Sequence, residues 1–346
     1  MSVMKVFKKY IKKAIATTSG RTGKWDKTSK MKVLIKCFDG FEKERWEKMI
    51  EQEYPMLLNK TDFRIVESKL EFLKFIGNAE AVFSDDIEDI QLAHKALFYQ
   101  IPLTGVDYIE RYASSNVIIV TSRGLASRSV AEYVLGYLLF HAKQIANTLI
   151  DRTKRQWSQE HYFNTLQMLN SVNVCIMGYG AIGQEIASIL EIFHTNLFIV
   201  DIKFDKSHTL SRGSTYYKSF EEVQAPLDYI IITLPLNKST KHIINGKYFE
   251  KIGSHCILIN ISRGEVINEK DLIYALKNHQ IAGAVIDVVT KEPLTNTSVL
   301  WDCPNLIVTP HISGNIYIIR EKIMKRFLDN VSNARKRETL VGRITF

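Results

Sequence analysis

Short apolar runs alternate with longer amphipathic segments along most of the chain. The first series of runs predicts strands at 33–35, 63–66, 81–83, 97–99 and 117–120, with a helix at 41–52. A second series predicts strands near 172–178, 196–201, 228–234, 256–262, 283–289 and 305–310, with helices near 182–193 and 269–280. Strands that are apolar on both faces and alternate with helices are typical of parallel sheets with covered faces. We therefore predict an α/β protein with two parallel sheets.

Two further helical patterns divide the chain. Apolar residues keep helical spacing from about Ser127 to His141 and beyond, between the two series, and again from Tyr317 to Asn333, after the second. A chain of 346 residues is long for one domain and comfortable for two. We predict an extension at 1–30, a first domain at 31–125 completed by 315–346, and a second domain at 126–314.

A glycine-rich turn follows the first strand of the second series. Its glycines are Gly178, Gly180 and Gly183, and Asp201 ends the next apolar run, 18 residues after Gly183. The first glycine permits a tight turn, the second lets the backbone approach a pyrophosphate, and the third lets the helix pack on its strand. A carboxylate at the position of Asp201 reaches the adenosine ribose and repels a 2′-phosphate. The pattern predicts a dinucleotide-binding domain that takes NAD(H) rather than NADP(H).

Net charge narrows the classes of partner. The chain carries +9, but residues 1–30 hold nine bases and one acid, so the remaining 316 residues, with 37 bases and 36 acids, carry only +1. A body so close to neutral argues against nucleic-acid binding. The basic segment has apolar residues at helical spacing. This segment is either a helix that binds an anionic membrane surface or a partner, a transit sequence, or a loosely ordered extension.

Cysteine spacing and hydropathy limit the remaining classes. The four cysteines are far apart and form no CxxC pair, which argues against a zinc site or a disulfide scaffold; we expect no metal. Such cysteine usage fits a reducing compartment, so we predict a cytoplasmic protein. No apolar stretch approaches the length needed to span a bilayer.

Three later apolar runs end in residues that could carry chemistry. Arg263, Glu292 and His311 each follow a predicted strand of the second series. Ligands of open α/β sheets bind at the carboxyl ends of strands, so we expect these side chains near one cleft. An arginine binds a carboxylate in bidentate fashion, and a histidine exchanges protons near neutral pH. The trio therefore predicts hydride transfer between a nicotinamide cofactor and a 2-keto acid.

With these motifs the chain resembles the D-isomer-specific 2-hydroxyacid dehydrogenase family. The resemblance is carried in order by residues 105–109, 129–132, 178–183, 234–236, 260–264, 287–293 and 309–314. It implies two Rossmann-like or flavodoxin-like domains with an active-site cleft between them. Residues 31–125 and 315–346 would form the substrate domain, and residues 126–314 the NAD-binding domain. It also implies a homodimer formed through the NAD-binding domain, with the segment after Ser127 taking part.

The resemblance also implies roles for single residues. Arg263 would orient the substrate carboxylate and keto oxygen, His311 would be the acid and base, and Glu292 would pair with His311. Asp201 would hold the adenosine ribose, and Asp287 would face the nicotinamide carboxamide. The substrate carboxylate would also meet the N–H groups of Thr104 and Gly105. The full set implied to contact the cofactor is Gly178, Gly180, Ala181, Ile182, Gly183, Asp201, Leu234, Pro235, Ile261, Asp287 and His311.

Two questions stay open at the level of sequence. Arg123 departs from the family pattern: it is either a residue that favours a second anionic group on the substrate or a solvated loop arginine. The main hypothesis is an NAD-dependent enzyme that interconverts a small 2-keto acid and its (R)-2-hydroxy acid. The alternative is a catalytically silent NAD(H)-sensing scaffold or corepressor-like binding protein on the same fold, for which the basic extension is the independent support.

Overall fold

The computed structural model describes residues 30–105, 109, 117–203, 214–334 and 340–344. The predicted basic extension at 1–30 lies, except for Lys30, outside the described residues. The chain divides into two compact units, one formed by Met1–Leu125 with Tyr317–Phe346 and the other by Ala126–Ile316. Within the described segments, no helix combines the length and hydropathy required to cross a membrane.

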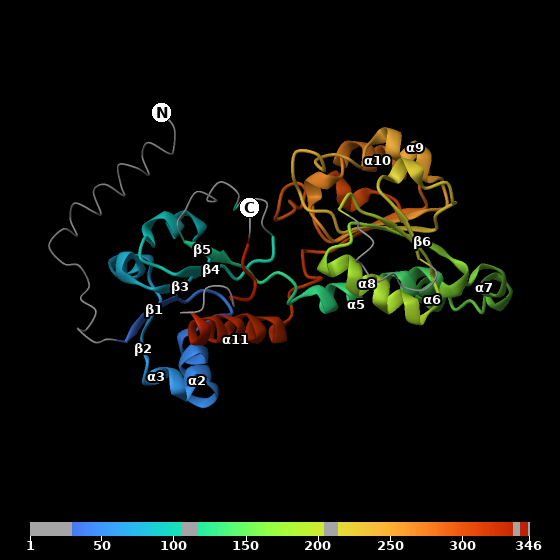
Figure 1. The fold of residues 1–346 in the computed structure, drawn as a ribbon. Coiled ribbons are helices and arrows are strands. Elements are labelled where there is room, and N and C mark those ends of the chain that lie inside the picture. Colours follow the sequence, from blue (N-terminus) through green and yellow to red (C-terminus); the bar gives the residue numbers. More distant parts are fainter. Residues whose placement is uncertain (1–29, 106–108, 110–116, 204–213, 335–339, 345–346) are drawn as a thin grey trace. The chain divides into compact units, whose positions relative to one another are not determined.

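The first unit is built on a five-stranded parallel sheet in the order β2-β1-β3-β4-β5 (Figure 1). Its strands are β1 (Met31–Lys36), β2 (Thr61–Val66), β3 (Ala81–Phe83), β4 (Phe98–Gln100) and β5 (Ile118–Val120). Its helices are α2 (Lys43–Glu53), α3 (Pro55–Leu58), α4 (Lys69–Phe75), η1 (Ile76–Asn78), η2 (Ile87–Leu92) and α11 (Tyr317–Asn333). The middle strand β3 is fully buried and apolar throughout, and β1 is buried and apolar at Val33, Leu34 and Ile35, as in parallel sheets that are covered on both faces.

Aromatic rings tie the C-terminal helix to this sheet. The Phe327 ring of α11 lies 5.3 Å from the Phe83 ring, 5.7 Å from the Phe98 ring and 5.8 Å from the Trp46 ring, measured between centroids. All four side chains are fully buried. Edge-to-face and tilted contacts at these distances stabilise a core beyond the area that they bury. The C-terminal helix therefore packs on strands that lie more than 200 residues before it in the sequence.

The second unit holds a seven-stranded parallel sheet in the order β12-β11-β10-β9-β6-β7-β8. Its strands are β6 (Asn173–Met177), β7 (Asn196–Val200), β8 (Ser214–Tyr217), β9 (Tyr229–Ile232), β10 (Ile257–Asn260), β11 (Gly283–Ile286) and β12 (Leu306–Val308). Its helices are α5 (Ser127–Ala142), α6 (Ile145–Lys154), α7 (Gln159–Thr165), η4 (Leu169–Ser171), α8 (Ala181–Ile192), η5 (Phe220–Glu222), α9 (Gly246–Ile252), η6 (Gly264–Val266), α10 (Glu269–Lys277) and η7 (Val299–Asp302). Helices α9 and α10 cover one face of the sheet, and α5 and α8 the other (Figure 1).

The strand order of the second unit reverses between β6 and β9, because β7 and β8 lie on one side of β6 and β9 to β12 on the other. Ligands of such sheets bind outside the carboxyl ends of the strands at this switch point. The three predicted strands that carry Arg263, Glu292 and His311 end earlier than expected, at Asn260, Ile286 and Val308. The first N–H group after each strand, from Ile261, Asp287 or Thr309, still bonds to a carbonyl at the end of the neighbouring strand, and the residues beyond it form the loops.

Candidate active site

The glycine loop at the switch point connects β6 to α8. Gly178 has φ +98°, and a Cβ built on it would lie 2.8 Å from Thr233 Oγ1. A Cβ on Gly183 would lie 2.1 Å from the Gly178 carbonyl oxygen. A Cβ on the exposed Gly180 would meet nothing within 4 Å. The first and third glycines are thus required by the protein's own backbone, while the space beside the second is open.

The start of α8 presents unsatisfied donors beside this open space. The helix begins at Ala181 with Gly180 as its N-cap, and no side chain caps it. The first N–H groups of a helix lack an intrahelical acceptor and carry the positive end of the helix dipole. The loop therefore fits the pyrophosphate of a dinucleotide, which is the ligand that such a helix start binds.

Asp201 closes the loop from the next strand. Its Oδ2 accepts a hydrogen bond of 2.6 Å from the Tyr179 N–H, and its Oδ1 accepts one of 2.7 Å from the Lys203 N–H. Because Tyr179 stands between Gly178 and Gly180, these bonds place the carboxylate directly against the glycine loop. Thr233, at the end of β9, donates its hydroxyl to the carbonyls of Met177 and Gly178 and holds the loop from the other side.

The loops after β10 and β11 lie against each other. Asn260 is fully buried, and its side chain accepts hydrogen bonds from Ser262 and donates one to the Arg263 carbonyl. These bonds turn the chain at Arg263, whose half-buried guanidinium donates to the Ser262 carbonyl. A Cβ on Gly264 would lie 2.0 Å from the carbonyl carbon of Val289. The backbone beside Arg263 therefore packs directly on the loop that leads to Glu292.

Glu292 and His311 are brought together. His311 Nδ1 lies 2.8 Å from Glu292 Oε2, and Glu292 Oε1 accepts a 3.3 Å hydrogen bond from the Val289 N–H. Both side chains are accessible, with 51% of the histidine side chain and 39% of the carboxylate exposed. An exposed pair adds little to folding stability, so its value lies in fixing the imidazole ring. Because Nδ1 is held by Glu292, Nε2 is the nitrogen left to meet another group.

Asp287 is the buried residue of the site. It is 1% exposed, and its carboxylate accepts hydrogen bonds from Thr309 Oγ1 and from the N–H groups of Ile312 and Ser313. A carboxylate has about four acceptor positions, so one remains for the nicotinamide carboxamide of the prediction. No role is predicted from the sequence for the Thr309 and Asn260 side chains, because both act on the protein's own loops rather than on a ligand.

The other predicted residues are distributed over both units. Leu234 and Pro235 follow β9, and Ile261 is buried after β10. Thr104 and Gly105 follow β4 in the first unit, where Thr104 is exposed. The predicted motif at 105–109 falls partly outside the described residues. In the part of the chain that the structure describes, no group of three or more His, Cys, Asp or Glu side chains could hold a metal ion.

Comparison with known proteins decides the family. A family model described as "D-isomer specific 2-hydroxyacid dehydrogenase, NAD binding domain" matches residues 135–313, more than half of the chain. The chain belongs to this family. The resemblance predicted from the sequence is thereby confirmed, and the matched NAD-binding domain supports an oxidoreductase with a nicotinamide cofactor.

Individual relatives agree with this membership. A glycerate dehydrogenase of Methylorubrum extorquens is 28% identical over 236 residues, covering 66% of this chain and 72% of the relative. A family member from Aeromonas salmonicida has a solved structure with a TM-score of 0.74 and 25% identity, covering 92% of this chain and 99% of that one. A glyoxylate/hydroxypyruvate reductase of Sinorhizobium meliloti, solved with NADP and sulfate, has a TM-score of 0.74 at 20% identity, covering 91% and 98%. The predicted α/β fold class is confirmed.

Proposed function

We propose that the protein uses NAD(H) to interconvert a small 2-keto acid and its (R)-2-hydroxy acid. The observation that carries this proposal is the 2.8 Å contact between His311 Nδ1 and Glu292 Oε2, on loops after strands of the sheet that holds the glycine loop. Glycerate and glyoxylate, which the names of relatives contain, belong to this substrate class. The (R) configuration is supported by the family description, which is specific for the D-isomer.

Each residue of the trio has one task in the proposed reaction. His311 donates a proton from Nε2 to the keto oxygen during reduction and takes it back during oxidation. Glu292 keeps the imidazole oriented and stabilises its charged form while the proton is held. The planar guanidinium of Arg263 binds the substrate carboxylate. When bound, the nicotinamide supplies or accepts the hydride.

The cofactor in this proposal is NAD(H), held by the loop from Gly178 to Gly183. Support comes from the open space beside Gly180 and from Asp201, whose carboxylate lies against the loop. A carboxylate at this position accepts hydrogen bonds from ribose hydroxyls and repels a 2′-phosphate. Asp287, Leu234, Pro235 and Ile261 would surround the nicotinamide half.

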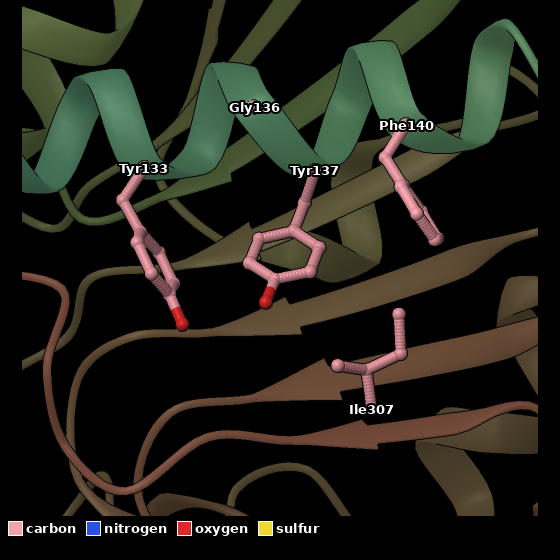
Figure 2. Close-up of a pocket in the computed structure, with 5 residues that line it drawn as sticks. All are labelled: Tyr133, Gly136, Tyr137, Phe140 and Ile307. Carbon is pink, nitrogen blue, oxygen red and sulfur yellow. The ribbon is translucent and has the colours of Figure 1, made fainter. Parts of the chain in front are cut away.

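We further propose a homodimer formed through the NAD-binding domain. Figure 2 shows three aromatic side chains of α5, Tyr133, Tyr137 and Phe140, projecting toward Ile307 of β12. Together with Gly136 they line a largely apolar groove of about 400 Å³. This apolar groove on α5 supports a part for the helix in the proposed dimer. Analytical ultracentrifugation of the purified protein tests the dimer.

The cytoplasmic location stays a prediction, which rests on the spacing of the cysteines.

The function is tested by NADH consumption against a panel of 2-keto acids, with a His311→Ala variant. Loss of a general acid typically lowers turnover by about 10²- to 10⁴-fold. His194→Ala is a matched control, because His194 is also exposed and has the same φ of +54° but lies beyond the end of α8. A collapse confined to His311→Ala supports the proposal. NADH binding without turnover of any keto acid would favour the scaffold alternative.

A further inference from the structure

His311 is held in a left-handed backbone conformation, which is uncommon for residues other than glycine. Its φ is +54°, in the left-handed region where a Cβ crowds the backbone. The residue follows a strand and Pro310, and its side chain is exposed, so packing of the ring does not impose this conformation. Surrounding hydrogen bonds must therefore over-determine the backbone, as is common for residues of this kind at functional sites.

Asp287 supplies most of these bonds. Its backbone carbonyl accepts a hydrogen bond of 2.9 Å from the His311 N–H. Its carboxylate accepts bonds of 2.9 Å and 3.0 Å from the N–H groups of the next two residues, Ile312 and Ser313. One buried residue thus holds three successive N–H groups, and the turn that they form points the imidazole away from its strand.

The carboxylate is in turn oriented by a chain of hydroxyl groups. Thr309 Oγ1 donates to Asp287 Oδ1 at 2.7 Å, and Tyr133 donates its phenol to the same Oγ1 at 2.6 Å. Each hydroxyl has one proton to donate: Tyr133 donates to Thr309, and Thr309 donates to Asp287. The direction of both hydrogen bonds is therefore determined. Burial raises the pKa of Tyr133 above its ordinary value, which keeps the phenol a donor.

Helix α5 also contacts the loop that follows His311 at a second point. Ser129 Oγ donates a 2.9 Å hydrogen bond to the Ser313 carbonyl, and Ser129 and Tyr133 are four residues apart on one face of the helix. Gly314 lies against the same helix, since a Cβ there would be 3.3 Å from the Val130 Cγ2. Figure 2 shows the Tyr133 hydroxyl pointing from α5 toward the strands.

From this arrangement we infer that Tyr133, Thr309 and Ser129 are positioning residues, through which one face of α5 holds His311 in its reactive orientation. The inference rests on the proposed function, because the orientation matters only if His311 exchanges a proton with substrate. The Thr309 carbonyl accepts a 3.0 Å hydrogen bond from the His311 N–H, but the described hydrogen bonds of the three hydroxyl groups go to other residues. The hydroxyls therefore act on His311 through Asp287 and the loop backbone. A misplacement of about 1 Å far from the reacting atoms costs about 10²-fold in rate.

The test compares steady-state kinetics of Thr309→Val, Thr309→Ser, Tyr133→Phe and the Tyr133→Phe/Thr309→Val pair. We expect kcat of Thr309→Val to fall by about 10- to 100-fold while KM and NADH affinity stay within about twofold. Ser at this position keeps the hydroxyl and restores kcat. Because Tyr133 acts through Thr309, the double variant loses no more than Thr309→Val alone.

A matched control variant and a crystal structure distinguish a positioning role of Thr309 from a general loss of stability. Thr195→Val makes the same isosteric change at a buried threonine whose hydroxyl has no hydrogen-bond partner among the described residues, and kcat should not change. The crystal structure of Thr309→Val should show His311 outside the left-handed region or separated from Glu292. Wild-type kcat in Thr309→Val, or an unmoved His311 in that variant, would overturn the inference. If the wild-type protein reduces no keto acid, the proposed function fails, and the crystal structure still decides whether Thr309 holds the loop.

Discussion

Alanine substitutions at two glycines of the loop after β6 should distinguish an effect on cofactor binding from an effect on folding stability. Gly180 has φ −74° and ψ −167°, an extended conformation open to any residue, and a Cβ there meets nothing within 4 Å. Gly180→Ala should therefore fold as well as the parent, or be more stable by up to about 1 kcal/mol through a less flexible unfolded chain. The added methyl instead occupies the space proposed for the pyrophosphate.

The size of the binding defect follows from the bonds at stake. A backbone N–H bound to a charged oxygen contributes about 1.5–3 kcal/mol. If the methyl displaces the pyrophosphate from one such donor, NADH affinity falls by about 10- to 150-fold. Gly183→Ala behaves differently, because its Cβ would lie 2.1 Å from the Gly178 carbonyl oxygen. Overpacking of this kind costs about 1–3 kcal/mol in stability.

Calorimetric titration with NADH and thermal melting of both variants measure the two effects. The control is Gly246→Ala at the start of α9, where the nearest atoms to a new Cβ are 3.8 Å away. Gly180→Ala should lose affinity at an unchanged melting temperature, and Gly183→Ala should lose both. NADH affinity equal to that of the parent in Gly180→Ala would refute the placement of the pyrophosphate.

Three other variants test separate parts of the structure. Asp201→Ser should narrow the preference for NADH over NADPH by at least about tenfold, measured as the ratio of the two kcat/KM values; an unchanged ratio would contradict its role. Arg123 lies next to Ser122, whose N–H bonds to the carbonyl of Leu103 beside the Thr104 loop. Arg123→Ala should slow only keto acids with a second anionic group, and unchanged rates with every keto acid would make it a solvated residue. Trp46→Ala should lower the free energy of unfolding in urea by about 3–5 kcal/mol, whereas the 90% exposed Trp157 should tolerate alanine.

Most of the fold could be predicted because parallel strands buried on both faces leave unbroken apolar runs. The elements that were missed lack this signature. Strand β8, Ser214–Tyr217, is an edge strand with partly exposed residues, and α9 is a short helix of seven residues. Helix α6 follows a break at Gln144, which has φ +53°. Left-handed residues other than glycine carry no clear sequence signal, so the break could not be expected.

The candidate site shows the same division. Residues that would react with ligands are predictable because arginine, glutamate and histidine at strand ends have a specific chemistry. Residues that hold them are not, because the Tyr133–Thr309 bond joins positions 176 apart and depends on how α5 packs on the sheet. Sequence spacing determines which face of a helix a residue occupies, but not which loop that face meets.

The proposed reaction also explains why the histidine needs two independent supports. Proton transfer requires that Nε2 lie within hydrogen-bond reach of the substrate oxygen, so both the ring and the backbone that carries it must be oriented. Glu292 fixes the ring through Nδ1, whereas Asp287 fixes the backbone through three N–H groups. An exposed carboxylate suits the first task because it stabilises an imidazolium that forms and disappears in each turnover. The second task requires a permanent geometry, which a buried carboxylate held by three hydrogen bonds from the protein provides.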